Sequence, residues 1–194
     1  MQLQLLLITF LQFVIAGKTD FYMSLAKSAE DLTHQNVKYD PSYYKIEYPM
    51  GDVPADKGVC ADVVVRAYRK MGIDLQTLVH EDMKLNFHVY PKIWGLKKCD
   101  TNIDHRRVPN LMTFFSRAGS SCTISNKSKD YQPGDIVCWQ LNSGAKHIGI
   151  VSSKYSFIHG RYYMVHNIGS GQVIEDCLFS FTIIGHYRYG WKSG

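Results

Sequence analysis

Residues 131–153, with the sequence YQPGDIVCWQLNSGAKHIGIVSS, constrain the fold more than any other stretch of this chain. A turn at Pro133 and Gly134 precedes an apolar run, and a polar loop containing glycine leads to a second apolar run that starts at His147. Two apolar runs joined in this way predict a β-hairpin. The segments RYYMVHNIGSGQ and FTIIGHYRYG predict further strands, so the second half of the chain is expected to form an antiparallel sheet.

Apolar residues at helical spacing dominate the chain before residue 120. The segment 60–71 places its apolar residues on one stripe, and Gly72 provides a natural stop. Its three consecutive valines have low helix propensity, so burial against the sheet must stabilise this helix. Further helices are expected over residues 20–36, over 76–82, and from Pro109 to about 119. Helices that precede an antiparallel sheet predict the α+β class.

The length of the chain limits the number of domains, and its charge limits the classes of partner that it can bind. The 194 residues suffice for one domain, which we expect over residues 18–194. The formal charge of +5 is a mild attraction for anionic partners, and we find neither zinc-finger spacing nor an aromatic RNA-binding motif. No nucleic-acid partner is therefore predicted. The oligomeric state stays open.

The N-terminal residues 1–17 form an apolar segment with no charged side chain. The apolar run is too short for a comfortable membrane span, so no stable span is predicted. It ends in small residues suited to signal-peptidase cleavage, although a basic n-region is missing. We expect an export signal and a periplasmic or secreted protein, with an uncleaved anchor or a buried amphipathic helix as alternatives.

The five cysteines are an odd number, so at least one thiol stays unpaired within the monomer. If Cys60 is that thiol, then Cys99, Cys122, Cys138 and Cys177 can pair in three ways. No C-x-x-C pair is present, which argues against a structural zinc. The clusters at 80–82 and 100–106 match no metal template and are expected to form ion pairs and caps. No metal and no cofactor are predicted.

Cys60 lies at the expected start of a helix, where unpaired N–H groups and the macrodipole stabilise a thiolate. A cysteine nucleophile also needs a base, and His147 opens a strand directly after a polar loop. By the strand period of two, Gly149 lies on the same face as His147 and predicts open space beside the imidazole. The local sequence thus supports a buried structural role and a catalytic role for Cys60 about equally.

Longer motifs decide between the two roles. GVCADVVVRAYR, PGDIVCWQL, HIGIVS and VHNIGSGQVIED together resemble the NlpC-type, papain-like cysteine peptidases of bacterial cell walls. Residues 35–190 more closely resemble a bacterial family known only as a domain of unknown function. The resemblance implies a papain-like fold with N-terminal helices packed on the sheet, a nucleophile at Cys60 and a base at His147.

The third catalytic member implied by the resemblance has more than one candidate. His166 is favoured because a glycine-rich turn and then an apolar strand follow it. Asn167 is a neighbour that can orient the base instead. His159 is nearer to His147 in the sequence, but its surroundings predict a hairpin turn.

The peptidases that the chain resembles carry Ser-Gly after the cysteine, whereas Ala61 and Asp62 stand here. Asp62 therefore either favours the helix start or contacts substrate. Arg106 or its neighbour Arg107 is a candidate for binding a substrate carboxylate, and Tyr48 is a further candidate for substrate contact.

The predicted function is hydrolysis of a peptide or amide bond, with bacterial peptidoglycan stem peptides as substrate. The alternatives are an acyltransferase on the same fold, an antibacterial effector toxin that degrades cell walls, and a non-catalytic module that binds them.

Overall fold

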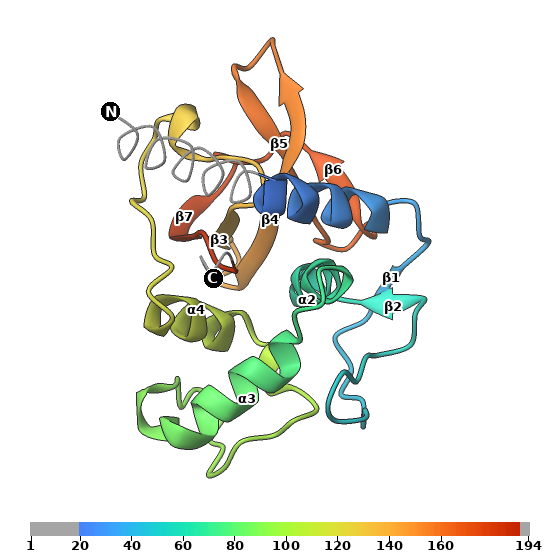
Figure 1. Cartoon of the computed structure of the whole chain (residues 1–194), viewed down its shortest axis with the longest axis vertical. Helices are drawn as coiled ribbons and strands as arrows, with labels where there is room; N and C mark the ends of the chain where they lie inside the picture. The colour runs from blue at the N-terminus through green and yellow to red at the C-terminus, as the bar shows by residue number, and fades with distance from the viewer. Residues whose placement is uncertain (1–19, 191–194) are drawn as a thin grey trace, which may run out of the picture.

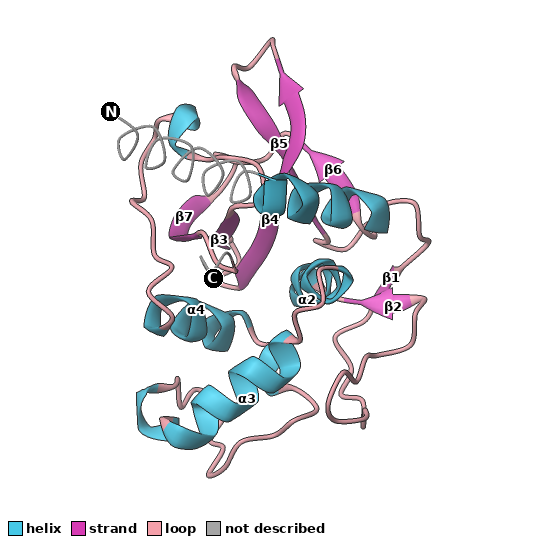
Figure 2. Cartoon of the chain, in the orientation of Figure 1, coloured by secondary structure: helices cyan, strands magenta, loops and turns pink. Residues whose placement is uncertain are grey.

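The computed structural model describes residues 20–190, and the expected export signal lies outside this range. Helices come first and strands follow, as the cartoons show (Figures 1 and 2). After a helix over residues 20–32, the elements in chain order are β1 (Lys38–Tyr39), β2 (Lys57–Gly58), α2 (Cys60–Lys70), α3 (Leu75–Leu85), the 3-10 helices η1 (Phe87–Val89) and η2 (Asp104–Arg106), α4 (Val108–Arg117), a third 3-10 helix η3 (Ser128–Asp130), β3 (Ile136–Gln140), β4 (Lys146–Ser156), β5 (Arg161–His166), β6 (Val173–Glu175) and β7 (Thr182–Tyr187).

The main sheet has five antiparallel strands in the order β6-β5-β4-β3-β7. The predicted hairpin is β3 and β4, in which Trp139 pairs with His147. A separate pair of short parallel strands, β1 and β2, precedes α2. The α+β class is therefore confirmed, and the order of strands places the start of β4 between β3 and the end of β5.

Helix α2 begins at Cys60, as predicted, and lies near the centre of the molecule between the sheet and α3 (Figure 1). The sequence predicts one buried stripe, but every residue from 60 to 68 is buried, Asp62 and Arg66 included. This difference arises because the sheet covers one side of α2, while α3 and η2 cover another. Burial on several sides explains how a segment with three valines stays helical.

The predicted helix boundaries differ in detail from the structure, and the helix expected over residues 20–36 ends at residue 32. Helix α3 is longer than the predicted 76–82 and starts at Leu75, because the Asp74 side chain accepts a hydrogen bond from Gln76 N and caps it. Helix α4 carries Pro109 in its first turn, as predicted. Among residues 20–190, no helix is both long and apolar enough to cross a membrane.

Hydrophobic residues cover both faces of the sheet. On one face, Ile148 and Ile150 of β4 pack with α2 and α4 in the larger core. On the other face, Trp139 and Val151 belong to a smaller core with residues of the chain that follows β6. Because side chains alternate along a strand, His147 lies on the second face, beside Trp139.

Candidate active site

The candidate nucleophile, Cys60, is the first residue of α2. The Val59 backbone N–H, just before the helix, donates to Asp62 Oδ2 at 2.7 Å. This bond closes the first turn of the helix around Cys60, and the residue is only 6% exposed. The fold therefore holds the sulfur at a helix start, as the sequence predicts.

A cavity of about 430 Å³ opens beside the thiol. Cys60 lines it together with the aromatic side chains of Tyr39 and Trp94 and the basic side chains of Arg107 and Lys146. The Arg107 guanidinium lies 4.2 Å from the centre of the Trp94 ring. The cavity thus offers room for a ligand next to the sulfur and positive charge to bind it.

Burial dominates the electrostatics of the thiol and raises the pKa of Cys60 to about 12. The backbone N–H groups of Ile148, Ala61 and Cys60 itself act in the opposite direction and favour the thiolate, whereas the charge of Asp62 disfavours it. The helix start therefore stabilises the thiolate as expected, but the loss of thiolate hydration on burial outweighs this effect. Cys60 is a neutral thiol at neutral pH and needs a base to become a nucleophile.

The structure brings His147 and His166 together. His147 is the second residue of β4, and His166 is the last residue of the neighbouring strand β5. The distance from His147 Nε2 to His166 Nδ1 is 2.8 Å, and the two rings meet nearly edge to face. Both side chains are buried. With Nε2 engaged, His147 has only Nδ1 left for another partner.

Two neighbours fix the pair of imidazoles in place. The Trp139 ring stacks on His147, with ring centroids 5.5 Å apart. Gly149 does not leave the open space that the sequence predicts. A Cβ atom built there would lie 2.8 Å from Val165 O and 3.1 Å from His166 Cβ. The glycine is needed because β5 approaches this closely, so the imidazoles are tightly packed.

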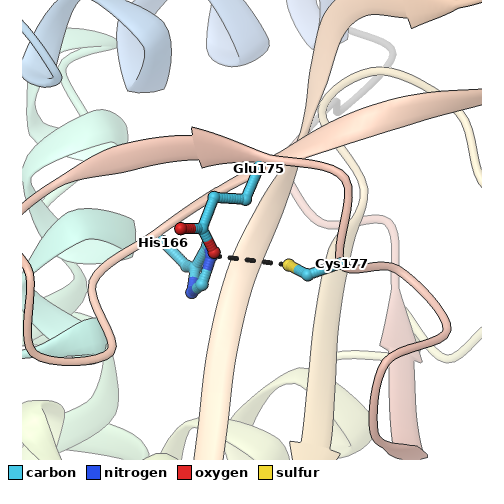
Figure 3. A group of neighbouring side chains, drawn as sticks. All are labelled: His166, Glu175 and Cys177. Carbon is cyan, nitrogen blue, oxygen red and sulfur yellow. Dashed lines mark hydrogen bonds and ion pairs between the residues drawn. The ribbon is translucent and has the colours of Figure 1, made fainter.

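The hydrogen-bonded pair of imidazoles continues to a carboxylate. His166 Nε2 lies 3.0 Å from Glu175 Oε2 of β6 and 3.4 Å from Cys177 Sγ (Figure 3). Sequence reasoning did not find either residue as part of the site. Glu175 lies two positions from Val173, the β6 partner of His166, and so shares a face with it, but this register cannot be read from the sequence.

Burial also holds both imidazoles neutral. It lowers the pKa of His147 to about 3, and the neighbouring His166 acts in the same direction. Burial lowers the pKa of His166 as well, against the opposing charge of Glu175. Between the described residues Cys60 and His147 no hydrogen bond is formed, which is common in sites without substrate. In the resting protein Cys60 is thus a neutral thiol and His147 a neutral imidazole, rather than an ion pair.

This resting state predicts how Cys60 responds to pH. Between about pH 6 and 9 the thiolate fraction should rise about tenfold per pH unit, because the pKa of the thiol lies above that range. We expect the rate of Cys60 alkylation by iodoacetamide, followed by peptide mass spectrometry, to rise with the same slope. A rate that is independent of pH over this range would show a preformed thiolate and would contradict the neutral pair.

The predicted substrate contacts Asp62 and Arg106 bind each other. Arg106 Nε donates to Asp62 Oδ1 at 2.8 Å, and Nη2 donates to Oδ2 at 3.0 Å. Arg106 Nη1 donates to Ser42 O. Both side chains are buried, so this pair anchors the start of α2 to η2. Arg106 and Arg107 both line the cavity, but a substrate carboxylate would have to compete with Asp62 for Arg106.

The remaining candidates lie elsewhere. Tyr48 donates to Glu81 of α3 at 2.9 Å and does not line the cavity beside Cys60. His159 lies in the predicted turn between β4 and β5 and pairs with Asp176. The Asn167 amide donates to Gly58 O at 3.4 Å, away from the imidazoles. Of the three candidates for the third member, only His166 contacts His147.

The acidic clusters form the ion pairs and caps expected of them. Asp104 accepts a backbone hydrogen bond from Asp100 N, at the start of η2, and pairs with Arg107 at 3.6 Å. Asp82 pairs with Arg117 of α4. Free thiols are present at Cys99, Cys138 and Cys177, so none of the three disulfide pairings forms in full.

The chain matches the family model described as "Domain of unknown function (DUF1287)" over residues 26–189. A protein of Escherichia coli (strain K12), described as "Uncharacterized protein YijF", is 50% identical over 176 residues, which cover 91% of this chain and 85% of that protein. Among solved structures, that of NlpC1 from Trichomonas vaginalis is similar, with a TM-score of 0.46 and 14% identity. The match covers 88% of this chain and 45% of that protein, so the chain spans less than half of its length.

Proposed function

This chain belongs to the DUF1287 family, and from that premise we propose that it is a papain-like cysteine hydrolase that cleaves a peptide or amide bond. Two observations carry the proposal: the contact of 2.8 Å between His147 Nε2 and His166 Nδ1, and the position of Cys60 at a helix start. Nucleophilic catalysis needs a cysteine, a base and a group that orients the base. Cys60, His147 and His166 supply these three roles.

The hydrogen bonds support Nδ1 as the nitrogen of His147 that acts as the base. A carboxylate only accepts hydrogen bonds, so Glu175 accepts the N–H at His166 Nε2. His166 Nδ1 then carries a lone pair and accepts the N–H at His147 Nε2. A neutral imidazole has one N–H, which leaves a lone pair at His147 Nδ1. Glu175 thus orients His147 through His166, and Nδ1 is the atom that takes the thiol proton.

The reaction then follows in two halves. As Cys60 Sγ attacks the carbonyl carbon, His147 Nδ1 takes the thiol proton and later gives it to the leaving amine. The oxyanion is stabilised by the backbone N–H groups at the start of α2, those of Cys60 and Ala61. A water molecule, deprotonated by His147, hydrolyses the thioester and restores the thiol.

Peptidoglycan stem peptides are the substrate that we propose. They carry free carboxylates, and the cavity beside Cys60 presents the basic groups of Arg107 and Lys146. The aromatic rings of Tyr39 and Trp94 offer apolar contact to the peptide backbone. The apolar segment at residues 1–17 supports export to the compartment that contains this polymer.

Digestion of purified peptidoglycan, read by mass spectrometry, tests the proposal. We expect wild-type protein and His159→Ala to release the same fragments, because His159 lies in an exposed turn. His147→Ala is expected to release none above the level without enzyme. Product that contains an added acceptor amine would indicate acyl transfer instead. Unchanged release by His147→Ala would exclude the proposed base, and binding without any cleavage would favour the non-catalytic module.

Replacing Glu175 tests the orientation of the base. We expect Glu175→Ala to lower kcat about ten- to a hundredfold with little change in KM, as is typical for residues that orient a catalytic group. Nitrogen NMR of the imidazoles should show the proton of His147 spread over both nitrogens. Asp176→Asn is the matched control, because this neighbouring carboxylate pairs with His159 and Arg161 instead. A kcat equal to that of wild type in Glu175→Ala would remove Glu175 from the mechanism.

A further inference from the structure

We propose that His166, Glu175 and Cys177 form a Zn²⁺ site directly behind the catalytic pair. The sequence predicts no metal site, because these residues fit no known spacing. In the structure, however, their side chains converge (Figure 3). One ligand atom of each lies within 4.8 Å of the other two, namely the His166 nitrogen, the Glu175 oxygen and the Cys177 sulfur.

The two distances from His166 Nε2 to the other ligand atoms are close to those of a zinc tetrahedron, and the distance from the Glu175 oxygen to the Cys177 sulfur lies within 4.8 Å. With Zn–N and Zn–O of about 2.0 Å and Zn–S of about 2.3 Å, the N–O edge is roughly 3.3 Å and the N–S edge roughly 3.5 Å. The structure has 3.0 Å from His166 Nε2 to Glu175 Oε2, and 3.4 Å from that nitrogen to Cys177 Sγ. Small rotations of two side chains are therefore enough to close the site around an ion.

The chemistry of the three donors also favours zinc. A thiolate, an imidazole and a carboxylate are the ligand types that Zn²⁺ takes, and the sulfur disfavours Mg²⁺ and Ca²⁺. His166 is held through its other nitrogen by His147, the kind of second contact that fixes a metal-binding imidazole. The Glu175 side chain is 48% exposed, so an ion can enter from solvent. Three protein ligands leave the fourth position of the tetrahedron to water.

Zinc at this site would switch off the base, a consequence that rests on the proposed function. Zn²⁺ at His166 Nε2 requires a lone pair there, so the proton of His166 moves to Nδ1. That N–H then donates to His147 Nε2, and the proton of His147 comes to lie at Nδ1. His147 can no longer accept the thiol proton, and Glu175 no longer orients the pair. The site therefore acts as an inhibitory zinc switch.

The test measures metal binding directly, apart from any hydrolysis. Metal-free full-length protein is titrated with Zn²⁺ by calorimetry, and Co²⁺ is used as an optical probe for a thiolate ligand. We expect one equivalent of Zn²⁺ and a thiolate-to-cobalt absorption band in wild type. Cys177→Ala should lose the band and weaken Zn²⁺ binding beyond the roughly 10- to 100-fold that loss of an outer-shell partner costs.

Three variants make the assignment specific. Glu175→Gln changes a partly exposed side chain and should weaken Zn²⁺ binding even if Cys177→Ala proves unstable. Cys99→Ala and Cys60→Ala should both retain the band and the affinity. Loss of the band in Cys60→Ala with retention in Cys177→Ala would place the metal on the nucleophile and overturn the proposal, as would absence of stoichiometric binding. Absence of hydrolysis in wild type would count against the proposed function and leave this binding result unaffected.

Discussion

Replacing Cys60 with alanine is expected to abolish peptidoglycan cleavage while leaving the fold intact. The sulfur forms the covalent bond in the proposed reaction, and no other thiol among residues 20–190 lines the cavity. Removing the nucleophile of such a triad should lower kcat by at least about a thousandfold. The Cα of residue 60 keeps its place, because the Val59 to Asp62 hydrogen bond that closes the helix start is retained.

The matched control is Cys99→Ala, which removes a thiol outside this cavity. Cleavage rates of both variants are compared by mass spectrometry, and circular dichroism and thermal unfolding report the fold. A Cys60→Ala protein that cleaves at the rate of Cys99→Ala would end the proposal that this chain is a cysteine hydrolase.

Breaking the pair of Asp62 and Arg106 is expected to have the largest effect on stability. Each atom that pairs these two groups is buried, and two hydrogen bonds of 2.8 and 3.0 Å join them. Arg106→Ala leaves a buried carboxylate with no opposite charge, a change that costs about 3–5 kcal/mol. Asp62→Ala also removes the acceptor of the Val59 N–H. The free energy of unfolding, measured in urea, should fall accordingly in both variants.

Arg117→Ala serves as the comparison, because it breaks an ion pair with Asp82 at the surface. Water solvates the remaining carboxylate there, so the midpoint of unfolding should move far less. A double variant, Asp62→Ala with Arg106→Ala, should be less destabilised than the sum of the single variants. If Arg117→Ala and Arg106→Ala lowered the free energy of unfolding equally, the buried Asp62–Arg106 pair would contribute no more to stability than a surface ion pair.

Local patterns in the sequence predicted much of this fold. The start of α2 at Cys60, the hairpin that begins with Ile136, and the turn containing His159 are all confirmed. Each depends on residues close together in the chain, where helical spacing, strand alternation and turn residues act locally. The small pair β1 and β2 was not predicted, because two residues per strand carry no periodic pattern.

Contacts between segments that are distant in the chain could not be predicted from the sequence. The pairing of Asp62 with Arg106 joins residues 44 positions apart, so neither residue alone shows whether it binds substrate or its partner. The open space expected at Gly149 is filled by His166, because the approach of β5 depends on the twist and register of the sheet. Desolvation likewise depends on everything packed around Cys60, which explains why burial overrides the effect of the helix start on its pKa.

The sequence by itself thus determined which residues can carry the chemistry, a cysteine at a helix start and a histidine at a strand start, since these positions follow from local periodicity. Only the tertiary structure decided which of the three candidates contacts His147, because strand pairing places His166, and neither Asn167 nor His159, against it. It alone added Glu175 and Cys177, whose positions depend on the register of β6 against β5 and on the path of the chain after it.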